Sequence, residues 1–150
     1  YRVDPREYGF MYHSNAEAYL HAGYNITPNY NVSVYAGISA IEDYHHTIPL
    51  SIRLTRYSGD DHMQDRWFSF IDLGSGFSIK EDPQSILTGK VGCGYRVSLS
   101  RDTKLDLLMS YRSVLTHPDI EYYGIKIPSD RINRNNAYVS AMSFGIALTF

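Results

Sequence analysis

Large and small side chains alternate through the last thirteen residues, and this alternation constrains the fold more than any other feature. Counting back from Phe150, every second position to Tyr138 is bulky and apolar except Ser140, and the positions between hold small residues and one valine. A period of two is that of a β-strand. A strand of a water-soluble sandwich would expose a polar or charged face instead. Bulky residues facing lipid and small ones facing a narrow lumen are typical of a transmembrane β-barrel strand.

The same separation of hydrophobic from charged or small residues recurs along the chain. Eight such strands in 150 residues leave about 19 residues for a strand and its connection, which accommodates the roughly 9 to 11 that a tilted spanning strand needs. The sequence therefore predicts one all-β domain, 1–150, that is an eight-stranded antiparallel up-and-down transmembrane β-barrel. The predicted strands are a short run of Tyr8, Phe10 and Tyr12, then 17–26, 31–39, 48–55, 67–79, 86–99, 104–116 and 138–150.

The composition excludes several other classes. Fourteen Lys and Arg against sixteen Asp and Glu offer no excess of positive charge for nucleic acid. No run exceeds three apolar residues, so we expect no transmembrane helix. The single cysteine, Cys93, excludes an internal disulfide and a cysteine-based zinc site. The polar start, Tyr1 to Glu7, lacks a signal-peptide layout, so we expect a mature or untargeted chain.

The connections and aromatic residues support the same topology. Connections at 27–29, 58–65 and 101–103 fall on the side of the C-terminus, taken as periplasmic, and the long connection 117–135 falls on the other. Among the 14 tyrosines, several predicted outward rings lie near strand ends, where amphipathic rings favour the membrane interface.

Two turns also predict strand register. If the flanking strands pair symmetrically about the connection 101–103, Ser98 lies opposite Asp106 and Arg96 lies diagonal to Asp106. If they pair symmetrically about 27–29, Tyr19 lies opposite Gly37 and His21 lies opposite Tyr35.

The segment Tyr138 to Phe150, with Leu148 among its alternating hydrophobes, resembles the C-terminal strand signal of bacterial outer-membrane β-barrel proteins. That resemblance implies residence in the bacterial outer membrane, contact with its lipids including lipopolysaccharide, and recognition by the barrel-assembly machinery during biogenesis. The segments 48–56, 70–77, 92–95 and 105–112 also resemble the small outer-membrane barrels of Bacteroidetes-type bacteria, which have an OmpA- or OmpX-like architecture.

The lumen of such a barrel is just filled by side chains, so a general diffusion pore is disfavoured. Charges removed from water must pair or meet water, and we therefore expect the inward charged residues to form a lumen polar network. A gated ion or proton path is the alternative use of the same residues. The network has five positive and three negative members: Glu17, Arg53, Asp72, Lys90, Arg96, Lys104, Asp106 and Arg112.

Catalysis and metal binding have weaker support. His13 and Ser14, near the loop-side rim, are the candidate catalytic pair for a lipid A-modifying enzyme that resembles the lipid A deacylases. Those enzymes carry His and Ser two residues apart and late in the chain, whereas here the two are adjacent and early. His45 and His46 would point to opposite faces of a strand, so we expect neither a metal site nor a cofactor.

The connection 117–135 is long enough to be functional, and its mixture of Tyr and Arg is typical of interface anchors. We expect a non-enzymatic structural or accessory subunit of the envelope, whose external loops or outward face bind another envelope protein. The alternatives are the deacylase-like enzyme and a soluble lipocalin-like carrier, which would need the reverse placement of charge. A simple continuation of the hairpin is the other interpretation of this loop. Its candidate binding residues are Tyr122, Tyr123, Lys126, Arg131 and Arg134.

Overall fold

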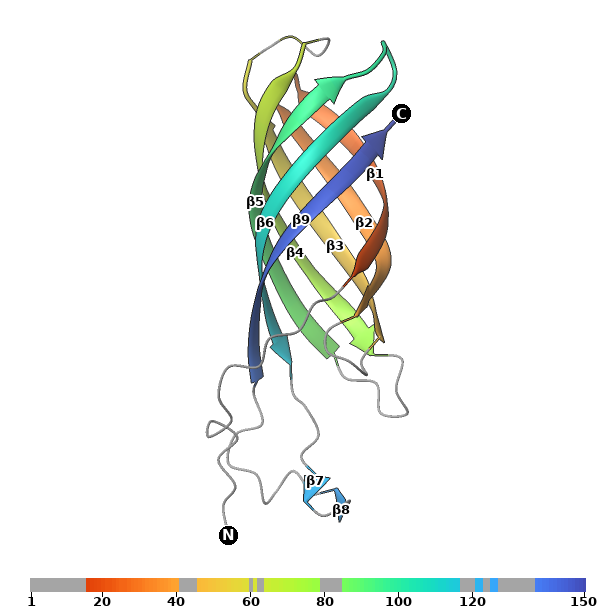
Figure 1. Ribbon diagram of the computed structural model, residues 1–150, viewed down its shortest axis with the longest axis vertical. Helices are drawn as coiled ribbons and strands as arrows, with labels where there is room; N and C mark the ends of the chain where they lie inside the picture. The colour runs from red at the N-terminus through yellow and green to blue at the C-terminus, as the bar shows by residue number, and fades with distance from the viewer. Residues whose placement is uncertain are drawn as a thin grey trace.

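The computed structural model describes residues 16–40, 46–59, 61, 64–78, 85–116, 121–122, 125–126 and 137–150. Within these ranges the chain forms one seven-stranded antiparallel meander and a separate two-stranded sheet (Figure 1). The predicted all-β, up-and-down arrangement is confirmed for these seven strands. The eighth predicted strand, at Tyr8 to Tyr12, lies outside the described residues. The meander contains β1 (Glu17–Thr27), β2 (Tyr30–Ala40), β3 (His46–Tyr57), β4 (Arg66–Ser78), β5 (Ser85–Ser98), β6 (Lys104–Thr116) and β9 (Ala137–Thr149), and the small sheet contains β7 (Glu121–Tyr122) and β8 (Ile125–Lys126).

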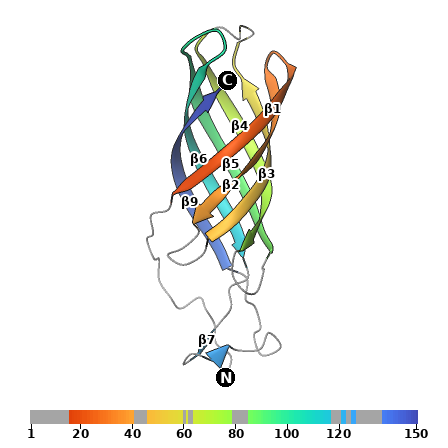
Figure 2. The same cartoon turned by 90° about the vertical axis from the view of Figure 1, so that its right-hand side faces the viewer.

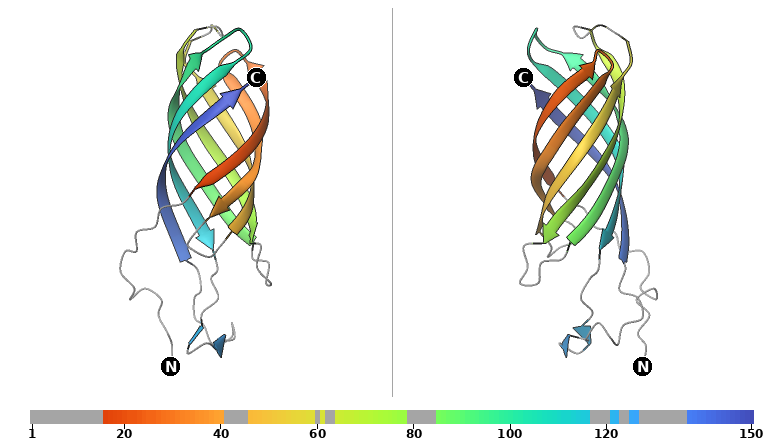
Figure 3. Two further views of the ribbon diagram at one scale, coloured as in Figure 1. Left: turned by 45° about the vertical axis from the view of Figure 1, so that its right-hand side comes forward. Right: turned by 180° about the vertical axis from the view of Figure 1, so that it is seen from behind.

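The seven-stranded sheet is tilted, twisted and curled (Figures 1 and 2). Its two edge strands, β1 and β9, both come to the front in the left view of Figure 3. The connections β1–β2, β3–β4 and β5–β6 lie at the end of the molecule that holds the C-terminus, which we call the turn end (Figure 1). We call the opposite end the loop end. No helix in the described ranges has the length and apolar character needed to cross a membrane.

The two faces of the sheet are the reverse of those in a water-soluble domain. Large hydrophobes of the predicted outward set are exposed, with Phe144 at 80%, while the inward carboxylate Asp72 is only 5% exposed. The buried apolar residues form two small clusters at opposite ends of the inner face. Since water would normally drive apolar side chains inward, this sheet has an outer face suited to an apolar surrounding. The clusters are Ile86 with Val114, and Tyr57 with Phe68 and Phe70.

The register agrees with the prediction at the first turn. Tyr19 lies opposite Gly37 and His21 lies opposite Tyr35. The His21 and Tyr35 rings stack with 4.8 Å between their centroids. The two-residue turn pairs Thr27 with Tyr30, and an irregularity between Asn25 and Thr27 then shifts the register by one residue to give this alignment.

The predicted register of β5 and β6 is wrong by two residues. Arg96, not Ser98, lies opposite Asp106, and Ser98 lies opposite Lys104. The cause is the connection 99–103, in which the backbone N–H groups of Leu99 and Ser100 both donate to the carbonyl oxygen of Thr103 at 3.1 Å. As a result, the point about which β5 and β6 pair symmetrically lies one residue closer to β5 than the sequence predicted. A shift of two residues preserves which side chains face inward.

Three glycines on the inner face make room for aromatic rings of the adjacent strand. A Cβ atom added at Gly92 would lie 2.6 Å from Cζ of Phe70, and one at Gly37 would lie 2.7 Å from Cδ1 of Tyr19. A Cβ atom added at Gly94 would likewise collide with the Phe68 ring. These positions require glycine because no side chain fits beneath the ring.

Candidate functional site

Ion pairs on the inner face of the sheet gather into three clusters, named here after Arg53, Glu17 and Arg96. They connect strands that are far apart in the sheet order as well as direct neighbours. Each cluster follows from the period-two placement of charged residues on one face of several strands. Together they form the candidate functional site.

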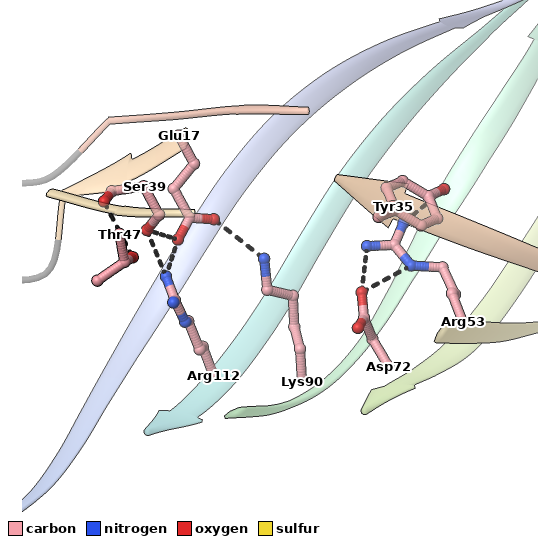
Figure 4. A network of polar contacts seen from close by, with 8 residues as sticks. All are labelled: Glu17, Tyr35, Ser39, Thr47, Arg53, Asp72, Lys90 and Arg112. Atoms are coloured by element: carbon pink, nitrogen blue, oxygen red, sulfur yellow. Dashed lines mark hydrogen bonds and ion pairs between the residues drawn. The ribbon is translucent and has the colours of Figure 1, made fainter. Parts of the chain in front are cut away.

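The Arg53 cluster joins β3 to β4 and β2. Arg53 and Asp72 are direct cross-strand partners, and the Arg53 Nε and Nη2 donate to Asp72 Oδ2 at 3.2 and 2.9 Å. The Arg53 Nη1 donates to the Tyr35 hydroxyl at 3.0 Å. The guanidinium carbon also lies 3.9 Å from the Tyr35 ring centroid and 4.1 Å from that of Phe70 (Figure 4 shows Arg53, Asp72 and Tyr35). Two aromatic faces and one carboxylate therefore compensate for the buried charge.

The Glu17 cluster joins β1 to β5 and β6 across the inner face. Lys90 and Arg112 are directly opposite each other in register, which places two like charges side by side. The Glu17 carboxylate lies between them: Lys90 Nζ donates to its Oε2 at 3.0 Å, and Arg112 Nη1 donates to its Oε1 (Figure 4). Ser39 donates to Glu17 Oε1 at 2.9 Å and accepts from Arg112 at 3.0 Å. One carboxylate thus pairs with both cations, and the three groups together keep a net charge of +1.

The Arg96 cluster lies toward the turn end. Arg96 binds Asp106 in a bidentate manner, with Nε to Oδ1 and Nη2 to Oδ2 both at 2.6 Å. The guanidinium carbons of Arg66 and Arg96 lie 4.0 and 4.7 Å from the centroid of the buried Tyr57 ring. Arg66 Nη1 also donates to the carbonyl oxygen of Pro28 at 3.1 Å, which ties β4 to the first turn. This geometry holds strands together at the turn end.

Seven of the eight residues predicted for the lumen polar network take part in these ion pairs. The eighth, Lys104, instead donates to the backbone oxygen of Ser100 at 2.9 Å in the connection before β6. Sequence reasoning missed the other contributors to the clusters. Their positions in the strand alternation assign them to the inner face, but the sequence analysis did not consider them as partners of the charged residues. The missed residues are Tyr35, Ser39, Tyr57, Arg66, Phe68 and Phe70.

Several predicted site residues cannot be placed in this way. The catalytic candidates His13 and Ser14 lie outside the described residues, as do the loop residues Tyr123, Arg131 and Arg134. Only the backbones of Tyr122 and Lys126 are described, and they pair in β7 and β8 with Ile125 and Glu121. Tyr138, Leu148 and Phe150, predicted as the assembly signal, are all exposed.

Within the described ranges no group of three or more His, Cys, Asp or Glu residues could hold a metal ion. His45, considered in the sequence as half of an adjacent pair, lies outside these ranges. Comparison of the chain with protein-family models, with curated proteins and with solved structures found no match. The function is therefore argued from the geometry of the chain itself.

Proposed function

We propose that the sheet closes into a transmembrane β-barrel in a bacterial outer membrane. The observation that carries this proposal is the reversed polarity of the sheet, with hydrophobes exposed and ion pairs buried. In lipid, closure is required because an open sheet edge would leave backbone groups without hydrogen bonds. The predicted eighth strand would complete the wall and remains part of the proposal.

Contacts between distant strands support closure. Glu17 on the edge strand β1 pairs with Lys90 on β5 and Arg112 on β6, which lie four and five strands away in the sheet order. Side chains of the edge strand β1 thus reach strands that lie far from it in the sheet order.

The proposed role is a structural or interaction subunit of the envelope, not a pore. The ion-pair clusters of the inner face support this role, because paired charges that cross the interior occupy the space an aqueous channel would need. Binding would then fall to the external loop 117–135 or to the outer face. The surrounding lipid, including lipopolysaccharide, and the assembly machinery are the other proposed partners.

The barrel and its closed lumen can be tested on the purified chain, refolded from denaturant into detergent and then into liposomes. We expect a β-rich circular dichroism spectrum, a mobility shift between heated and unheated samples in electrophoresis, and no steady conductance in a planar bilayer. A mainly helical spectrum, or a soluble monomer without detergent, would refute the barrel. Stable single-channel openings would refute the closed lumen alone.

The interaction role is tested by affinity capture from detergent-solubilised envelopes. Replacement of 117–135 by a short turn is expected to remove a stoichiometric protein partner while the barrel still folds. Unchanged recovery of that partner would show that the loop does not bind it.

A further inference from the structure

The outer face carries a hollow of about 680 Å³, and none of the ion-paired residues of the inner face lines it. Its lining is largely apolar and extends from Tyr30 on β2, across β3 to β6, to Met142 on β9. Most of the lining residues are outward ones such as Leu54, Ile71 and Cys93, and Phe70, Gly92 and Ser110 of the inward set also contribute. Arg56 lies in the same lining. The volume falls within the roughly 300 to 1,000 Å³ of typical small-molecule sites.

The hollow arises from two small residues in a row of larger ones. Arg56 lies opposite Ser69, Ser69 opposite Cys93, and Cys93 opposite Met109. The next row toward the loop end has bulky residues at the corresponding positions, with Leu54 opposite Ile71 and Ile71 opposite Val91. Since Ser69 and Cys93 fill little space between their neighbours, the wall is indented there.

Arg56 adds a positive charge to this apolar indentation. It is an exposed residue one position before the end of β3, and it therefore lies at the turn end. Within the described ranges Arg56 has no carboxylate partner, unlike Arg53, Arg96 and Arg112 of the inner face. A guanidinium group suits a phosphate, which it can bind through two parallel hydrogen bonds.

An apolar hollow beside a cation that has no carboxylate partner among the described residues is complementary to an amphiphile with a hydrocarbon chain and an anionic head. We propose that the hollow retains one acyl chain of a glycerophospholipid whose phosphate binds Arg56. This inference rests on the proposed function, because the turn end meets a phospholipid leaflet only if the barrel spans the outer membrane with its turns on the periplasmic side. The site would hold one lipid in place among the freely exchanging lipids around it.

The test uses dioleoylphosphatidylglycerol with a photoactivatable diazirine in one acyl chain, added at low mole fraction to the full chain folded in dodecyl maltoside micelles. Cross-linked peptides are mapped and quantified by mass spectrometry. We expect saturable labelling of the segment 91–93, about tenfold above that of the exposed Leu20 on β1. Unlabelled dioleoylphosphatidylglycerol should compete, whereas dioleoylglycerol, which lacks the phosphate, should compete about tenfold less well, equivalent to about 1.4 kcal/mol.

Arg56→Gln is expected to raise the half-saturating lipid concentration about tenfold, and Arg56→Lys to restore part of the loss. Arg101→Gln, which removes an exposed charge from the β5–β6 connection, is the matched control and should leave labelling unchanged. Equal labelling of all outward segments, equal competition by both lipids, or an equal effect of Arg101→Gln would overturn the lipid site. Labelling that falls as protein concentration rises would assign the hollow to a second copy and would also overturn it.

The heated and unheated mobility of every sample is recorded alongside the labelling. A chain that does not fold in micelles refutes the proposed barrel, whereas a folded chain without preferential labelling refutes only the lipid site.

Discussion

Replacement of Glu17 by glutamine should destabilise the chain more than any single loss of charge at its surface. Lys90 and Arg112 face each other in register, and their side chains are only 12% and 7% exposed. Glu17→Gln removes the carboxylate that pairs with both buried cations, so the net charge of the three groups rises from +1 to +2. Removal of one member of a buried ion pair costs about 3 to 5 kcal/mol. The Ser39 hydroxyl remains in contact with Arg112, but it carries no charge to offset the cations.

The measurement is equilibrium unfolding in urea of the chain folded into liposomes. Trp67 is the only tryptophan and is 63% exposed on the outer face, so its emission reports whether that face is in lipid or water. We expect Glu17→Gln to lower the free energy of unfolding by about 3 kcal/mol or more. Asp102→Asn, which removes an exposed carboxylate from the β5–β6 connection, is the control and should stay within about 0.5 kcal/mol of the parent.

A second substitution distinguishes the effect of the lost charge at Glu17 from any effect on packing. Lys90→Met in the Glu17→Gln background removes one of the two uncompensated cations, so it should recover part of the lost stability through coupling between the sites. A loss below about 1 kcal/mol for Glu17→Gln, or no recovery in the double variant, would refute the account of Glu17 as the carboxylate that stabilises both cations.

Three further predictions use the same unfolding assay. Gly94→Ala should cost about 1 to 3 kcal/mol because its Cβ would collide with the Phe68 ring, whereas at Gly145 the nearest atom would be 3.8 Å away and alanine should be tolerated; equal costs would contradict this. Arg96→Met should cost about 3 kcal/mol because Asp106 stays buried without its partner, while Lys104→Met should cost under about 1 kcal/mol. Ile52→Arg, on the exposed face of β3, should cost about 2 to 4 kcal/mol in liposomes, and an unchanged midpoint would contradict a lipid-facing position.

The faces of the strands could be predicted from the sequence because charge and bulk both alternate with the strand period. Asp72 and Ile71, for example, are adjacent in the chain, and the structure buries the first and exposes the second. The pairing of Arg53 with Asp72 also lay within reach of sequence reasoning, since both were assigned inward. The face that a residue occupies follows from its position along its own strand, so it can be assigned without knowing the neighbouring strands.

Register and long-range contacts could not be predicted as well. The β5–β6 alignment depends on how Thr103 accepts two backbone hydrogen bonds, and residue types in the turn did not reveal this. The meeting of Glu17 with Lys90 and Arg112 depends on the curl of the whole sheet, which brings β1 across the inner face from β5 and β6. A pattern along one strand contains no information about that curvature.

The glycines beneath the Tyr19, Phe68 and Phe70 rings have a consequence for how the strands find their alignment during folding. Parity alone tolerates a slip of two residues, because such a slip returns every side chain to its own face. A slipped β4–β5 pair, however, would bring Phe68 over Gly92 or Arg96 rather than Gly94, and would move Phe70 over Lys90 or Gly94. In either direction one of the two rings would be displaced onto a long charged side chain. Two rings over two glycines spaced two residues apart therefore disfavour both neighbouring alignments, so contacts within the β4–β5 pair select its register without help from the other strands.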